Sequence, residues 1–181
     1  NKILAGRYLG NVLFLKIINL CIVFLMLHIL LGIRDYPVEA KAVVYIVALS
    51  VFIDAITMLF QAIFHAFERL ELISIGKIIK NALMVVGAFI ITTLELDLLS
   101  FAVLYVISSV ILLIFSTFIV IQKFSKPVFE IDLDFWKWLI KEGAPFWAAS
   151  VFIVIIVQTD KIMLSYMIGD EAVGLYSAAY R

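Results

Sequence analysis

Six polar residues recur on one side of an otherwise apolar stretch in the first half of the chain. They are Ser50, Asp54, Thr57, Gln61, His65 and Glu68. Spacings of three or four residues place all six within an arc of about 80° on a helix, along roughly 27 Å of its length. A carboxylate, an amide, an imidazole and hydroxyls can bind polar solutes and exchange protons. The spacing therefore predicts one polar helix face, which we call the polar stripe.

A second polar group lies in a later apolar stretch. Gln158, Lys161 and Ser165 share one helical face, and Asp160 points about 100° away from Lys161. The ammonium group of Lys161 is a compact point charge that suits phosphate and other anionic groups. An alternative is a lysine that extends its long side chain to water and a carboxylate paired with a neighbouring helix.

Enzyme chemistry finds little support in the sequence. The chain has no glycine-rich phosphate loop, no zinc-ligand spacing and no serine in a nucleophile elbow. Its single cysteine, Cys21, cannot form an internal disulfide or a CxxC site. We therefore expect a protein that is not an enzyme and that uses no cofactor or metal.

The composition indicates an integral membrane protein. Of 181 residues, 65% are hydrophobic and only 15% are charged, whereas soluble domains are about 45–50% apolar and about 25% charged. A soluble domain of this size could not bury so much apolar surface, and disordered chains have the opposite composition. The 14 basic and 14 acidic residues cancel, so no basic field favours nucleic acid.

Five continuous apolar runs are long enough to cross a bilayer as helices, which takes about 20 residues. They are Val12–Ile33, Ala42–Phe64, Ile75–Leu94, Leu99–Ile121 and Ala144–Ile168. The longest predicted connection is about Gln122 to Gly143. Two segments with mixed charged and apolar or aromatic residues, Phe67–Ile73 and Phe135–Ile140, are expected at the membrane surface. The sequence thus predicts an all-α, polytopic transmembrane helix bundle.

The basic residues predict the orientation of these helices. Ten fall at the first, third and fifth connections: Lys2, Arg7, Lys16, Arg69, Lys77, Lys80, Lys123, Lys126, Lys137 and Lys141. The alternate connections carry only Arg34 and Lys41. Cytoplasmic loops carry the excess of Lys and Arg, so we expect the start of the chain on the cytoplasmic side of the cell membrane.

The polar stripe has two interpretations inside a bilayer. Exposing Asp54 to lipid would cost several kcal/mol, so its face must meet protein or water. Hydrogen bonding between packed helices is one explanation. A water-filled pathway is the other, and we favour it because the stripe crosses nearly the whole hydrocarbon core. Ser108, Ser109, Ser116 and Thr117, in contrast, are predicted to be close-packing positions.

Four stretches of the chain are similar to the oligosaccharide (polysaccharide) flippase family of the O-antigen transporter type. This family belongs to the superfamily that includes the multidrug and toxin exporters and the peptidoglycan lipid flippases. The stretches are TDKIMLSYMIGDEAVGLYSAAYR (Thr159–Arg181), KEGAPF (Lys141–Phe146), FQAIFHAFERLELISIGKIIKNAL (Phe60–Leu83) and RYLGNVLFLKI (Arg7–Ile17). Because the chain starts at Asn1 rather than Met and stops at Arg181 in mid-pattern, we expect a fragment of a longer protein.

The resemblance implies a two-lobe flippase fold of which helices three to seven and the start of the eighth are present. Residues 1–122 would be part of the first transmembrane lobe, with four helices. Residues 123–143 would be a cytoplasmic linker between the lobes, and residues 144–181 would begin the second lobe. Family members have a central cavity that opens alternately to each side of the membrane.

The resemblance also implies a cargo, a lipid-linked oligosaccharide of the polyprenyl pyrophosphate type. Lys161 would attract the pyrophosphate, and Asp54, Gln61 and His65 would suit sugar hydroxyls. A proton or sodium ion could be coupled through Asp54 or Asp160. The candidates for the transport cavity are Asp54, Thr57, Gln61, His65, Gln158, Asp160 and Lys161. Two other functions stay open: a cation-coupled multidrug exporter of the same superfamily, and a membrane-embedded glycan-assembly enzyme.

Overall fold

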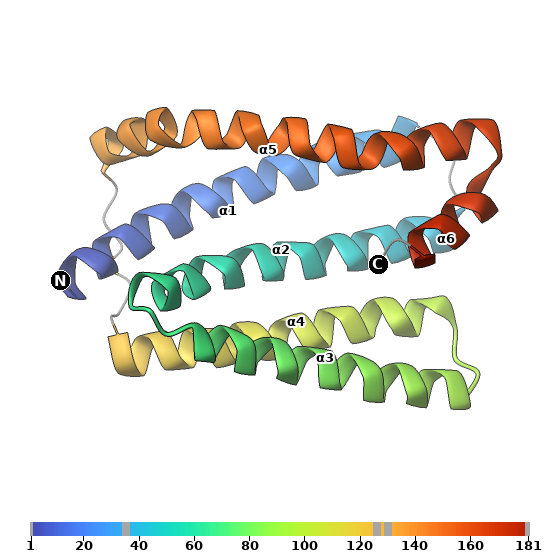
Figure 1. Cartoon of the computed structure of the whole chain (residues 1–181), viewed down its shortest axis with the longest axis horizontal. Helices are drawn as coiled ribbons and strands as arrows, with labels where there is room; N and C mark the ends of the chain where they lie inside the picture. Colours follow the sequence, from blue (N-terminus) through green and yellow to red (C-terminus); the bar gives the residue numbers. More distant parts are fainter. Residues whose placement is uncertain (1, 34–36, 125–127, 129–131, 180–181) are drawn as a thin grey trace. The chain divides into compact units, whose positions relative to one another are not determined.

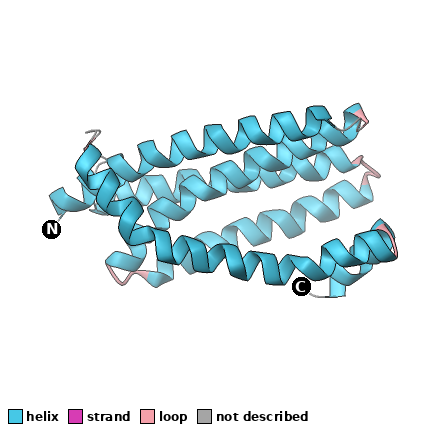
Figure 2. Cartoon of the chain, turned by 90° about the horizontal axis from the view of Figure 1, so that it is seen from above, coloured by secondary structure: helices cyan, strands magenta, loops and turns pink. Residues whose placement is uncertain are grey.

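The computed structural model describes residues 2–33, 37–124, 128 and 132–179, and in this part of the chain helices are joined by short turns, with no strand (Figure 2). The elements are α1 (Lys2–Ile33), α2 (Val38–Ala66), α3 (Leu70–Thr93), α4 (Leu98–Ile119), η1 (Val120–Phe124), α5 (Leu133–Met167) and α6 (Asp170–Ala179). Five of the helices are long and apolar enough to cross a membrane. The predicted all-α transmembrane bundle is therefore confirmed.

The helices are longer than the apolar runs that predicted them. The segment Phe67–Ile73 includes the start of α3 at Leu70, and Ile73 is buried. Its location at the membrane surface stays a prediction. Similarly, Phe135–Ile140 forms part of α5, which begins at Leu133, ten residues before the predicted end of the connection at Gly143. Charged residues at the ends of these helices do not stop helix formation, since Lys, Arg and Glu are good helix formers.

The chain divides into two compact units, residues 1–132 and 133–181. The first unit contains α1 to α4 with η1, and the second contains α5 and α6. The two-lobe assignment made from the resemblance stays a prediction.

Successive helices of the first unit run in opposite directions (Figure 1). The N-terminus, the α2–α3 turn and η1 lie at one end of this unit, which we call the amino end. The α3–α4 turn and the start of α2 lie at the other end, which we call the far end. Helices α2 and α4 run in the same direction and share the most extensive packing, and α3 packs mainly on α4.

The largest apolar cluster of the first unit lies at its amino end. It consists of Leu9, Phe60, Ile63, Phe64, Ile73 and Val120. The ring of Phe124 in η1 extends this cluster, with centroids 5.8 Å from Phe64 and 4.9 Å from Phe67. These contacts bring four segments of the chain together at one depth.

The two turns between α2, α3 and α4 have the same geometry. In each, a glutamate adopts a left-handed backbone conformation, with φ of 55° at Glu68 and 50° at Glu95. The following amide then closes the helix end, Arg69 N donating to Phe64 O and Leu96 N to Ile91 O. These hydrogen bonds satisfy carbonyls that a helix C-terminus leaves without partners.

Candidate functional site

Three helices of the first unit meet at an ion pair between Lys80 of α3 and Asp54 of α2. The Lys80 Nζ donates hydrogen bonds to Asp54 Oδ1 at 2.7 Å and to Asp54 Oδ2 at 2.6 Å. It donates a third, at 3.1 Å, to the hydroxyl of Ser109 on α4. The side chain of Lys80 is 16% exposed and that of Asp54 is 35% exposed. We call this group the Lys80 cluster.

The Lys80 cluster lies deep within the spanning helices. Asp54 is 12 residues before the end of α2 at Ala66, about 18 Å by helical rise. Lys80 is 10 residues after the start of α3 at Leu70, about 15 Å by helical rise. The sequence placed Lys80 among the basic residues of the third connection, whereas in the structure it lies within α3 and pairs with Asp54.

The same finding weakens the count of basic residues that predicted the orientation. Lys16 and Lys77 also lie inside helices rather than in connections. Arg34 and Lys126 lie outside the described residues. The cytoplasmic location of the start of the chain therefore stays a prediction.

The far-end half of the polar stripe is packed between helices. Ser50 and Thr57 are both 1% exposed. Their hydroxyls donate to backbone carbonyls of their own helix, Ser50 to Val47 at 2.7 Å and Thr57 to Ile53 at 2.9 Å. Such bonds satisfy a hydroxyl in an apolar interface and let neighbouring helices approach closely.

The amino-end half of the stripe is more accessible. Gln61 is half-buried, whereas His65 and Glu68 are exposed. The accessibility of the stripe thus increases from Thr57 towards the amino end. Whether these groups line a transport cavity stays a prediction.

The hydroxyl residues of α4 have the close-packed positions that the sequence predicted. Ser108, Ser109 and Ser116 are at most 1% exposed, and Thr117 is half-buried. Ser108 donates to the carbonyl of Leu104 at 2.6 Å. Sequence reasoning did not foresee that Ser109 accepts a hydrogen bond from a lysine.

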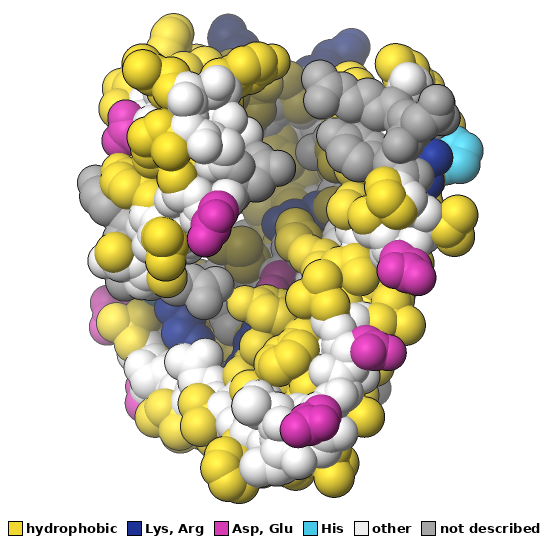
Figure 3. Space-filling model, turned by 90° about the vertical axis from the view of Figure 1, so that its right-hand side faces the viewer, with side chains coloured by type: hydrophobic (Ala, Val, Ile, Leu, Met, Phe, Trp, Pro, Cys, Tyr) yellow, Lys and Arg dark blue, Asp and Glu magenta, His cyan; other side chains and the backbone are white. Residues whose placement is uncertain are grey.

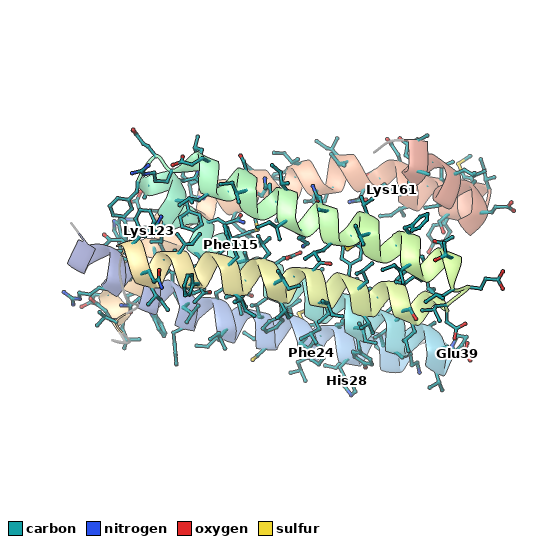
Figure 4. All side chains as sticks on the ribbon, turned by 90° about the horizontal axis from the view of Figure 1, so that it is seen from below. Phe24, His28, Glu39, Phe115, Lys123 and Lys161 are labelled. Carbon is teal, nitrogen blue, oxygen red and sulfur yellow. The ribbon has the colours of Figure 1, made fainter. Side chains whose placement is uncertain are left out.

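The polar group of the second unit lies on a helix without buried residues among those described. Gln158 and Asp160 are exposed, and Lys161 (labelled in Figure 4) is half-buried. A carboxylate oxygen of Asp160 accepts a hydrogen bond from the Tyr176 hydroxyl of α6 at 3.2 Å. The turn between α5 and α6 depends on Gly169, whose φ of +110° favours glycine.

A smaller polar contact joins α1 and α2 in the far-end half of the first unit. His28 Nδ1 and the Tyr45 hydroxyl are 2.8 Å apart, and the ring of Phe24 lies beside Tyr45 with a centroid distance of 5.8 Å. Figure 4 shows Phe24 and His28 on the half of the unit that carries Glu39, opposite the end that carries Lys123. His28 was not among the predicted site residues.

Metal chemistry is not indicated by the arrangement of side chains. Among the residues that the structure describes, no three His, Cys, Asp or Glu side chains gather closely enough to hold a metal ion. The Lys80 cluster instead combines a cation, an anion and a hydroxyl from three helices.

Comparison with known proteins identifies the family. Residues 4–181 match the polysaccharide biosynthesis protein family (Polysacc_synt). The chain belongs to this family. No curated protein and no solved structure matches the chain significantly.

Membership of the polysaccharide biosynthesis protein family agrees with the flippase resemblance drawn from the sequence. With five helices able to cross a membrane, this family member is a multi-pass membrane protein involved in making or exporting polysaccharide.

Proposed function

We propose that this protein is a flippase that moves a lipid-linked oligosaccharide across the cytoplasmic membrane by alternating access. The observation that carries the proposal is the family match over residues 4–181 of a chain with five membrane-crossing helices. A glycan precursor made on one side of a membrane must cross an apolar layer that its sugar hydroxyls cannot enter unpaired. A helical membrane protein that offers polar groups at depth removes that barrier.

The polar residues not already held by packing are the best candidates for contact with the cargo. On α2 these are Gln61 and His65, and on α5 they are Gln158, Asp160 and Lys161. Amide, imidazole and carboxylate groups suit sugar hydroxyls, and the Lys161 ammonium suits the pyrophosphate of a polyprenyl carrier. A proton or sodium ion is the proposed source of energy, with Asp160 as the accessible carboxylate.

Deletion of the gene in its host tests this function. We expect lipid-linked oligosaccharide to accumulate and surface glycan to be lost, and the wild-type gene should restore both. Unchanged surface glycan together with greater sensitivity to cationic drugs would favour a multidrug exporter. Loss of glycan with no lipid-linked precursor, or with a precursor of altered structure, would favour a glycan-assembly enzyme.

Complementation with variants tests the role of Lys161. Charge-assisted hydrogen bonds contribute about 1.5–3 kcal/mol, so Lys161→Met should lower transport about ten- to hundredfold while the protein still inserts. Lys161→Arg keeps the positive charge and should retain more activity. Lys141→Met, which removes an exposed lysine earlier in α5, is the matched control. Full transport by Lys161→Met would exclude Lys161 from cargo binding.

A further inference from the structure

We propose that the Lys80 cluster is an interhelical clamp, which holds α2, α3 and α4 together as one rigid body. In this assignment Lys80 positions Asp54, and Asp54 is committed to Lys80 instead of serving as the ion-coupling group of transport. The inference goes beyond the proposed function, because it concerns how these helices move and does not depend on the cargo.

The hydrogen-bonding capacity of the two charges supports the clamp. An ammonium group has three N–H donors, and all three donors of Lys80 have partners: two carboxylate oxygens of Asp54 and one hydroxyl oxygen of Ser109. A charge at this depth in a bilayer needs a partner of opposite sign. Within the cluster each charge neutralises the other, so neither has to reach water.

The close packing of α3 on α4 around the ion pair also supports the clamp. Gly76, Lys80 and Gly87 lie within an arc of about 40° on α3, which makes them one face. A Cβ atom added at Gly76 would lie 2.8 Å from the side chain of Leu112, and one added at Gly87 would overlap the side chain of Leu104. The two leucine side chains would have to shift to admit even a methyl group, so the two helices are in close contact on either side of Lys80.

The register of α3 against α4 supports the clamp as well. From Gly76 through Lys80 to Gly87 the partners on α4 are Leu112, Ser109 and Leu104, as two antiparallel helices in a single register require. Sliding α3 along α4 by one turn would separate Lys80 from Ser109 and push both glycines against new side chains. Buried ionic groups are best attested in this role, as determinants of registry.

Stability measurements on the full-length protein test the clamp. The variants are Lys80→Met, Asp54→Asn, Lys80→Arg and the double variant Asp54→Leu/Lys80→Met. We expect each of the two neutralising single variants to leave one charge unpaired, and therefore to lower the amount of folded protein in the membrane several-fold. The double variant should recover most of it, because well-packed apolar residues can replace a buried ion pair. Lys80→Arg should stay near wild type.

The matched control is Lys77→Met, which removes an exposed lysine one turn earlier on α3. It should leave the membrane level and the thermal unfolding in detergent unchanged. If Lys80→Met is as stable as Lys77→Met, the clamp is overturned. A double variant no more stable than the single variants also overturns it, because the two charges would then act independently.

Transport by the double variant tests the second part of the proposal. In the deletion strain, a well-folded Asp54→Leu/Lys80→Met protein should restore surface glycan. If it folds but restores none, Asp54 or Lys80 takes part in transport and the assignment to a clamp is wrong. The stability results do not depend on the cargo, so they hold or fail separately from the flippase proposal.

Discussion

Ser108 and Ser109 are neighbours in the chain and equally buried, yet their hydroxyls have different partners. Ser108 donates to the Leu104 carbonyl of its own helix. Ser109 accepts from the ammonium group of Lys80 on another helix. Both residues are 0% exposed, so burial alone would give them the same role. Their partners separate a residue that fills a packed interface from one that stabilises a charge.

This difference predicts unequal effects of two otherwise identical substitutions. Hydrogen bonds to charged groups contribute about 1.5–3 kcal/mol and neutral ones about 0.5–1.5 kcal/mol. Ser109→Ala should therefore lower the free energy of unfolding by about 2 kcal/mol, and Ser108→Ala by less than about 1 kcal/mol. Denaturation of the purified protein in detergent measures both. Equal losses would mean that the third donor of Lys80 contributes nothing.

The sequence predicted Asp54 as a site residue but did not reveal its ion pair with Lys80, for a physical reason. The apolar run that predicted the third helix starts at Ile75, whereas α3 starts at Leu70. Lys80 therefore lies ten residues, not five, after the start of its helix, a difference of about 7.5 Å by helical rise. A charged residue near the boundary of an apolar run resembles a residue that anchors a helix at the membrane surface. Only its partner on another helix shows that it belongs to an interhelical ion pair.

At the scale of the helices, the sequence predicted which helices form but not which of their faces are in contact. A continuous apolar run of about 20 residues has few alternatives to a membrane helix. Each of the five runs accordingly corresponds to one of α1 to α5, and each predicted end lies within about two residues of the end of its helix. The sequence did not predict close packing at the glycines of α3, because a glycine in an apolar helix is recognised as a packing position only when the neighbouring helix is known.

Gly76 provides the test of close packing between α3 and α4. A leucine at this position would meet Leu112 and Phe115 of α4, and overpacking of this kind costs about 1–3 kcal/mol. Gly76→Leu should therefore lower thermal stability in detergent without preventing insertion, since leucine is apolar. Gly32→Leu is the control, because a Cβ there has no neighbour within 4 Å. Similar stability of the two variants would show that α3 and α4 tolerate a larger separation.

At the scale of the molecule, the distribution of basic residues still favours the proposed orientation when Lys80, which is paired with Asp54, is left out of the count. The amino end of the first unit carries Arg69 in the α2–α3 turn and Lys123 in η1. The far end carries Glu39, Glu95 and Asp97, with Lys41 as its described basic residue. Figure 3 views the chain from this far end and shows acidic side chains among the hydrophobic ones. The positive-inside rule counts lysine and arginine near helix ends, so we expect the amino end in the cytoplasm.

Cysteine labelling in intact cells tests this orientation. Cys21 is replaced by serine first, because it is exposed on α1. A cysteine at Leu96, exposed in the α3–α4 turn, should react with a membrane-impermeant maleimide added outside. A cysteine at Arg69, whose exposed ion pair with Glu71 contributes little to stability, should react only after the cells are opened. The opposite pattern would place the amino end outside. A flippase with that orientation would present the accessible half of the polar stripe, with Gln61 and His65, to the outer leaflet.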